Sequence, residues 1–178
     1  MQRKSFSNLS CPIARSLERV GEWWSILILR DAFYGMTRFD EFQKSLVIAP
    51  NVLTRRLTSL VAAGLMERRQ YLEKPPRYEY MLTKSGKAFK PVMIALLAWG
   101  NSQFAPDGVS VVLTDLLTGE TVDPVLVDAK TGKVIAGDDY ILAAGPAASN
   151  GVHNRMAYAA MRRASPDKIP HFPMELMS

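Results

Sequence analysis

Apolar and polar positions follow a helical period between Ile48 and Ala63, and Gly64 ends this stretch. At about 100° per residue its apolar side chains share one face, made up of Leu53, Leu57, Leu60 and Val61. The opposite face carries polar side chains, among them Asn51 and Arg55, and Asn and Arg match adenine and guanine edges in the DNA major groove. The pattern fits both an amphipathic helix with a solvated polar face and a DNA-recognition helix. The neighbouring elements favour the second.

Three shorter helices are predicted before this stretch. The first covers residues 13–20, and the second, residues 22–34, is apolar almost all round and is expected to be the core helix. Thr37 is predicted to cap the third, which ends near Leu46 and carries a buried stripe of Phe39, Phe42 and Leu46. Only Val47 to Ala49 separate it from the next helix, and two short helices joined so tightly predict a helix-turn-helix.

The period changes to that of strands after Gly64. Residues 65–71 and 77–82 are predicted to form a hairpin, with the turn at residues 72–76. Pro75 and Pro76 cannot donate ladder hydrogen bonds, so they belong at the tip. The tip is flanked by basic residues, namely Arg68, Arg69, Lys74 and Arg77. A basic hairpin directly after a helix-turn-helix is typical of the wing of a winged-helix domain.

A long helix over residues 84–104 is predicted next, with Thr83 as its cap. Its apolar positions widen from a stripe to nearly the whole circumference, which one small domain cannot cover. A second copy of the chain packed on this helix would bury the excess and make a homodimer. The alternative is that residues 106–178 fold back over it.

Residues 106–108, Pro-Asp-Gly, mark a boundary, beyond which short β segments are expected at 109–114, 120–127 and 133–135. A short helix over residues 152–163 and an extended tail at 169–178 follow. We therefore expect an α+β fold: a winged helix-turn-helix domain with a long C-terminal dimerisation helix and a small β-rich C-terminal appendage. The predicted domain limits are an N-terminal arm at 1–10, the DNA-binding and dimerisation domain at 11–105, and the appendage at 106–178.

Charge is divided unevenly along the chain. Residues 1–100 hold 16 Lys and Arg against 8 Asp and Glu, a net +8, whereas residues 101–178 hold 6 against 9, a net −3. A basic front half suits a polyanionic partner, although a solvated surface gives the same excess. The chain shows no apolar run of about 18 residues and no secretory signal at its start. A single cysteine suits a reducing compartment, so a cytoplasmic location is expected.

The ordered segments of residues 11–100 resemble the HxlR-type winged-helix transcriptional regulators, within the MarR-like superfamily. The segments are CPIARSLERVGEWWSILILRD, RFDEFQKSL, IAPNVLTRRLTSLVAAGLMERRQY, PPRYEYMLTKSG and PVMIALLAWG. The resemblance implies a bacterial regulator of transcription that binds double-stranded DNA at a pseudo-palindromic operator. It also implies a homodimer formed through the N-terminal segment and the long helix, and no membrane.

Candidate DNA contacts follow from position. Asn51 and Arg55 are expected to read bases, and Thr54 and Thr58 to touch bases or phosphates. Arg56 lies on the flank of the helix, where a phosphate contact or an ion pair within the domain is expected. Phosphate contacts are expected from three further basic residues, Arg38, Lys74 and Arg77.

Cys11 matches the N-terminal cysteine of the family, which acts in some members as a redox or electrophile switch; a small buried side chain is the alternative role. The appendage resembles the zinc-ribbon-like extension of some members. Its turns read Thr118-Gly119 and Thr131-Gly132 where such a ribbon carries Cys-Gly. The thiolates of a structural zinc site are therefore missing, and neither a metal nor a cofactor is expected.

Two other functions remain open. A small-molecule sensor would hold its ligand between the appendage and the long helix, with Met93, Trp99, Phe104 and Tyr140 as candidate lining. An enzyme is the weakest hypothesis, because the chain has only two histidines and none of the common catalytic or phosphate-binding motifs.

Overall fold

The computed structural model describes Phe6 and residues 9–165, which form two compact units. One unit spans residues 19–135, and the other joins the residues up to Glu18 to those from Ala136 onward. The predicted tail at 169–178 and most of the arm at 1–10 lie outside the described residues. The domain limits at residues 10 and 105 stay predictions.

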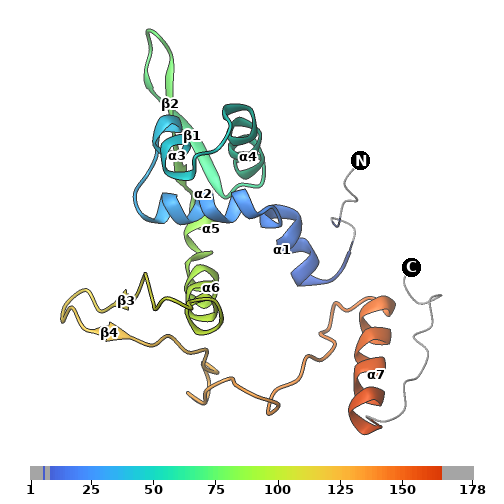
Figure 1. The fold of residues 1–178 in the computed structure, drawn as a ribbon. Helices are drawn as coiled ribbons and strands as arrows, with labels where there is room; N and C mark the ends of the chain where they lie inside the picture. The colour runs from blue at the N-terminus through green and yellow to red at the C-terminus, as the bar shows by residue number, and fades with distance from the viewer. Residues whose placement is uncertain (1–5, 7–8, 166–178) are drawn as a thin grey trace. The chain divides into compact units, whose positions relative to one another are not determined.

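The winged-helix part consists of four helices and a hairpin in the expected order. They are α1 (Pro12–Val20), α2 (Trp23–Phe33), α3 (Phe39–Leu46), α4 (Pro50–Ala62), β1 (Met66–Leu72) and β2 (Arg77–Leu82). In Figure 1, α3 and α4 lie on the same side of α2, and the β1–β2 hairpin projects beyond them. The fold is α+β and has the winged helix-turn-helix arrangement, as the sequence predicted.

The core of this part is where the apolar period placed it. Leu53, Leu57 and Leu60 of α4 are fully buried, against Ile28 and Leu29 of α2 in the same cluster. Full burial of one such side chain contributes about 1.5–3 kcal/mol. These leucines therefore hold α4 to the domain and leave its polar face outward.

The start of α3 corrects one expectation. Thr37 is not the cap, because α3 begins at Phe39 with Arg38 as its N-cap residue. The Glu41 carboxylate instead accepts the backbone N–H groups of Thr37 and Arg38, at 2.8 and 2.9 Å. A glutamate in the first turn can reach back to donors that the helix leaves unpaired. Val47 then ends α3 in the left-handed region, with φ of 50°.

The wing is hydrogen-bonded to the helix-turn-helix. β1 and β2 pair antiparallel from Met66 opposite Leu82, with a register shift between Gln70 and Leu72. The backbone N–H of Tyr80 donates to the carbonyl of Thr37 at 2.7 Å, and Arg38 forms an isolated bridge with Glu79. The segment before α3 thus pairs with β2 through one isolated bridge, and this pairing fixes the wing against the start of α3.

The predicted long helix at 84–104 is two helices, α5 (Lys84–Lys87) and α6 (Lys90–Gln103). The break follows from Pro91, which has no N–H to give to the carbonyl four residues earlier and so stands in the first turn of a new helix. Thr83 does cap α5, since its hydroxyl accepts the N–H of Gly86 at 3.1 Å. A Cβ at Gly86 would lie 2.0 Å from the carbonyl oxygen of Leu65, so α5 packs directly on the end of the α4–β1 turn.

No residue of α6 is buried, although the helix is mostly apolar. One face carries Val92, Leu96 and Trp99, with exposed fractions of 47%, 36% and 58%. Trp99 also meets Phe104 edge to face, with ring centroids 5.0 Å apart. The opposite face, at Ile94, Leu97 and Asn101, turns toward the segment that follows.

The appendage has less strand than predicted. Its only ladder within the described chain joins β3 (Leu113–Thr114) to β4 (Thr121–Val122), and a single bridge joins Val127 to Val134. Helix α7 (Asn150–Ala164) belongs to the other unit and is slightly longer than the predicted 152–163. A turn that pairs its own backbone groups lies between β3 and β4, and a second lies between Val127 and Val134.

Candidate nucleic-acid interface

The outer face of α4 presents Asn51, Thr54, Arg55 and Thr58, all exposed. The side-chain oxygen of Asn51 accepts the backbone N–H of Val52 at 2.9 Å. An amide oxygen has a second lone pair and its nitrogen has two donors, so the paired contact that Asn makes with adenine remains open. Arg55, one turn further along the helix, carries the fork that matches guanine.

The two threonines have less to offer a phosphate. The hydroxyl of Thr54 donates to the carbonyl of Pro50 at 2.8 Å, and that of Thr58 donates to the carbonyl of Thr54 at 2.9 Å. These bonds use the hydroxyl hydrogens, which a phosphate contact would need. In this conformation the groups left for DNA are hydroxyl lone pairs and a methyl group, which suit a base edge better.

Arg56 points away from this face. Its guanidinium forms an ion pair with the Glu22 carboxylate at 2.9 Å, and its side chain is only 14% exposed. Glu22 is the N-cap residue of α2, so the pair ties the recognition helix to the start of the core helix. The structure therefore gives Arg56 the intradomain role that the sequence left open beside a phosphate contact.

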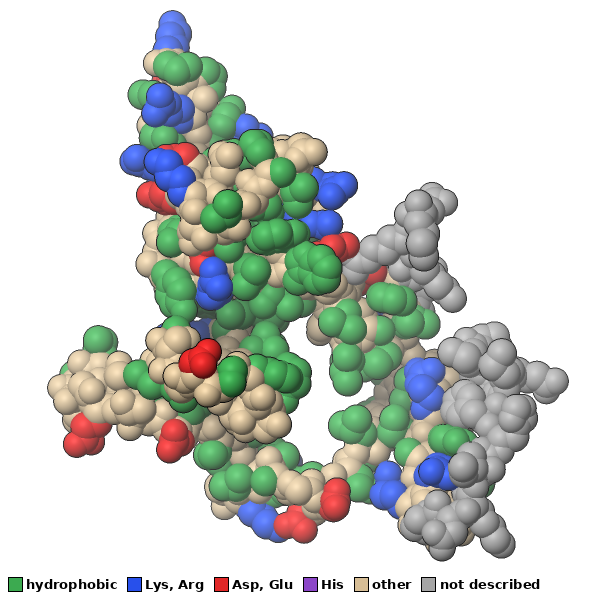
Figure 2. Space-filling model, viewed as in Figure 1, with side chains coloured by type: hydrophobic (Ala, Val, Ile, Leu, Met, Phe, Trp, Pro, Cys, Tyr) green, Lys and Arg blue, Asp and Glu red, His purple; other side chains and the backbone are tan. Residues whose placement is uncertain are grey.

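The wing divides its basic residues into two groups. Arg68 lies 3.5 Å from the ring centroid of Tyr78, and Arg69 forms an ion pair with Glu79 at 2.7 Å. Lys74 and Arg77, at the tip, are exposed and have no ion-pair partner in the part of the chain that the structure describes. Figure 2 shows Lys and Arg side chains along the projecting hairpin.

Arg38, the N-cap residue of α3, is the third basic residue expected to contact phosphate. It is exposed, and its guanidinium lies 4.9 Å from the ring centroid of Tyr71 on β1. A guanidinium over an aromatic ring keeps its N–H donors free at the edge. Arg38 can therefore be oriented by Tyr71 and still donate to a phosphate. The sequence indicated Arg38 but gave no sign of this orienting ring.

An HxlR-like helix-turn-helix family model matches residues 19–108, half of the chain. The chain belongs to the HxlR-like helix-turn-helix family. It is 36% identical over 75% of its length to Mb3122, an uncharacterised HTH-type transcriptional regulator of Mycobacterium bovis, 85% of which is covered. The match with Rv3095 of Mycobacterium tuberculosis has the same identity and coverage.

The similarity to two solved structures extends beyond the winged helix. PA1374 of Pseudomonas aeruginosa is 51% identical, with a TM-score of 0.60 over 82% of this chain and 99% of that chain. PA1607 is 40% identical, with a TM-score of 0.71 over 79% and 99%. Residues 1–108 make up less than two thirds of the chain, so both matches reach into the appendage. The relatives are regulators or candidate transcription factors, and no enzyme family is indicated.

Cys11, the candidate redox residue, directly precedes α1 and is partly exposed. The backbone N–H of Ala14 lowers the pKa of the thiol, and burial opposes this effect; the N–H of Ile13 and the charge of Arg155 on α7 lower the pKa further. A lowered pKa raises the thiolate fraction, which is the reactive form. The geometry thus suits a reactive cysteine.

The described residues contain no cluster of three or more His, Cys, Asp or Glu side chains that could hold a metal ion. Among the helices that the structure describes, none combines the length and hydropathy that a membrane crossing needs. The likeness of the appendage to a zinc-ribbon-like hairpin stays a prediction.

A hollow is present between α6 and the segment that follows it, but the residues predicted to line a ligand pocket there do not line this hollow. A hollow of about 490 Å³ lies between α6 and the β3–β4 hairpin. Met93, Trp99 and Phe104 do not line it, and Tyr140 lies in the other compact unit. The helical spacing identified an apolar helix correctly, but it could not show which of its two apolar faces would meet the appendage.

Proposed function

We propose that this regulator binds a pseudo-palindromic operator as a homodimer, with α4 of each subunit in a major groove. The observation that carries the proposal is the division of α4 into two faces: Leu53, Leu57 and Leu60 are fully buried while Asn51 and Arg55 are exposed. A helix anchored in this way presents its polar face as a rigid surface, which base recognition requires.

The wing and Arg38 extend the surface to the DNA backbone. Lys74 and Arg77 stand at the tip of a hairpin that is fixed to α3 by the Tyr80–Thr37 hydrogen bond. Contacts of this kind position a protein on the duplex without reading sequence, and they make affinity fall as salt rises. We therefore assign base reading to α4 and phosphate binding to Arg38, Lys74 and Arg77.

The dimer is proposed from the uncovered face of α6. Val92, Leu96 and Trp99 form an apolar stripe that nothing in residues 19–135 covers. A second copy related by a two-fold axis would bury the stripe on both subunits. Such a dimer would set the two α4 helices about one turn of DNA, roughly 34 Å, apart. We expect a DNA-binding regulator of this kind to act in the bacterial cytoplasm.

Arg55→Ala is the variant that tests base reading. Removing the guanidinium should cost about 1–3 kcal/mol of specific binding and relax base preference at one position per half-site. The measurement is selection of binding sites from a random DNA library, followed by titration of the best site by fluorescence anisotropy. Arg163→Ala on α7 removes the same charge and should leave base preference unchanged. An unaltered site profile for Arg55→Ala would show that another residue reads the base.

We also propose that Cys11 makes DNA release responsive to oxidants. Its thiolate would attack a peroxide oxygen, giving a sulfenic acid and releasing hydroxide. A second thiol would then displace water and leave a disulfide. Cys11 is the only cysteine of the chain, so that thiol belongs to another copy or to a small molecule.

Cys11→Ser should keep the DNA affinity of the reduced protein but lose the change in affinity that peroxide causes. Anisotropy titrations before and after peroxide, with mass spectrometry of the cysteine-containing peptide, measure both effects. Oxidant-dependent release that persists in Cys11→Ser would exclude the switch.

A further inference from the structure

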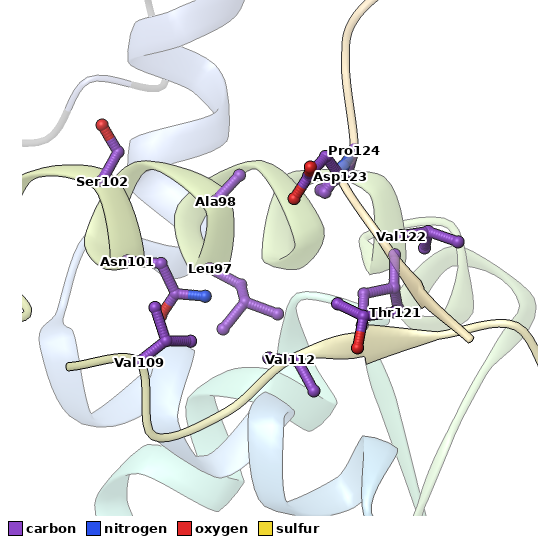
Figure 3. A pocket seen from close by; sticks show the side chains of 11 residues that line it. Leu97, Ala98, Asn101, Ser102, Val109, Val112, Thr121, Val122, Asp123 and Pro124 are labelled. Atoms are coloured by element: carbon purple, nitrogen blue, oxygen red, sulfur yellow. The ribbon is translucent and has the colours of Figure 1, made fainter. Parts of the chain in front are cut away.

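We propose that the hollow between α6 and the β3–β4 hairpin is an effector site for a small apolar molecule that carries an amine. Its volume of about 490 Å³ lies within the range of ligand pockets in proteins. Figure 3 shows Leu97 and Asn101 of α6 turned toward the extended segment that carries Val109 and Val112. Thr121 and Asp123 line the hollow from the β4 side.

The walls of this site are fixed before any ligand arrives. The side-chain amide of Asn101 donates to the backbone carbonyl of Val111 at 2.9 Å, which holds the extended segment to α6. The turn between β3 and β4 is held by Asp115, whose carboxylate accepts the N–H groups of Leu117 and Thr118 at 2.8 and 2.9 Å. A preformed site avoids the cost of ordering its walls when the ligand binds.

The chemistry of the lining indicates the ligand. The body of the site is apolar, with Leu97, Val109 and Val112 in its lining, and suits an aromatic or branched aliphatic group. Within residues 19–135, Asp123 is the charged side chain that lines it, and Thr121 adds a hydroxyl. A carboxylate in the lining favours a cationic donor and opposes an anion. These features together select a primary amine on an apolar body.

A ligand here would act on the helix that we propose for the dimer. The lining residues Leu97 and Asn101 lie on the face of α6 opposite Val92, Leu96 and Trp99, so pairing of two subunits would leave the hollow open. α6 follows α5 closely, and α5 packs on the carbonyl of Leu65 just after α4. The regulatory part of the inference rests on the proposed DNA-binding function, whereas binding of the amine does not.

The probe is 2-phenylethylamine, compared with 3-phenylpropionate, an anion of similar size, on the full-length protein. Isothermal titration and thermal shift should detect the amine and not the anion, because only the amine pairs with Asp123. Asp123→Asn should weaken amine binding on the order of five- to tenfold, as expected for a partly exposed ion pair. Asp107→Asn, an equal charge change outside the lining, should bind the amine as the unmodified protein does.

Equal binding of amine and anion, or an equal affinity for amine in Asp123→Asn, would overturn the site, as would no amine binding at all. The regulatory part is tested by operator titration with and without the amine. A shift in DNA affinity that is lost in Asp123→Asn supports it, and unchanged DNA affinity with bound amine overturns that part alone. Failure to bind any DNA would count against the proposed function and leave the amine titrations interpretable.

Discussion

The winged-helix part and the appendage at residues 106–135 are built on different principles. In the first, Ile28, Leu29 and Phe42 are fully buried together with the α4 leucines. In the second, no residue is buried, and large side chains such as Leu116 and Leu117 are 97% and 94% exposed. Apolar burial holds the one region and local turn hydrogen bonds hold the other. The contrast shows that a segment can keep a defined backbone without a core of its own.

The turns of the appendage show how this is achieved. Asp115 and Asp128 each begin a five-residue turn of the form Asp-x-x-Thr-Gly, thirteen residues apart. In both, the Asp backbone N–H reaches a carbonyl across the turn and the Gly N–H donates back to the Asp carbonyl, at 2.8–2.9 Å. The carboxylate then accepts further N–H groups within the turn. These hydrogen bonds define the conformation of both turns.

Leucine truncation in the two regions should give the largest contrast. Leu57→Ala removes a fully buried side chain from α4 and should lower the free energy of unfolding by about 2–5 kcal/mol. Leu116→Ala removes the same atoms from an exposed turn and should change it by less than about 0.5 kcal/mol. Urea unfolding followed by circular dichroism measures both. Similar losses of unfolding free energy for the two variants would show that the appendage is packed against another part of the protein.

The next largest effect is expected on self-association through α6, whose exposed apolar face is part of neither the winged-helix core nor the appendage. Trp99→Glu places a charge in the stripe proposed for the dimer and should weaken self-association by about 2–4 kcal/mol, as loss of an interface hot spot does. Sedimentation equilibrium over a dilution series gives the dissociation constant. Leu116→Glu, an equal change at an exposed leucine of the appendage, is the matched control. Unchanged association of Trp99→Glu would place the dimer contact elsewhere.

The smallest expected difference between the two regions is in their response to low pH. The N–H groups of Thr118 and Leu117 lower the pKa of Asp115 below its ordinary value of 3.8. A group with a lowered pKa in the folded state stabilises it above the unfolded pKa, and this contribution is lost as pH falls through the folded value. Below pH ~4 the turn should therefore loosen while the apolar core persists. Amide hydrogen exchange should show Thr118 losing protection at a higher pH than Leu57, and simultaneous loss would contradict the comparison.

The sequence predicted the first region well because its period reports burial. The spacing of Leu53, Leu57 and Leu60 placed the buried face of α4, and Pro75 with Pro76 placed the tip of the wing. The break before α6 was not predicted although Pro91 indicates it, because the cap at Thr83 and the apolar spacing from Phe89 onward suggested one continuous helix. The ring beside Arg38 and the Asn101–Val111 bond join segments by tertiary contact, which no local pattern reports.

Operator spacing can depend on a residue that never approaches DNA. Gly86 leaves no room for a side chain between α5 and the carbonyl of Leu65, so this close contact helps to fix the offset between the end of α4 and the start of α6. In the proposed dimer the offset of each subunit contributes to the distance between the two α4 helices, and the two-fold axis gives the two contributions opposite directions. The distance between the two half-sites that the protein can read is then a property of this contact, and a lineage that altered it would have to alter its operators at the same time.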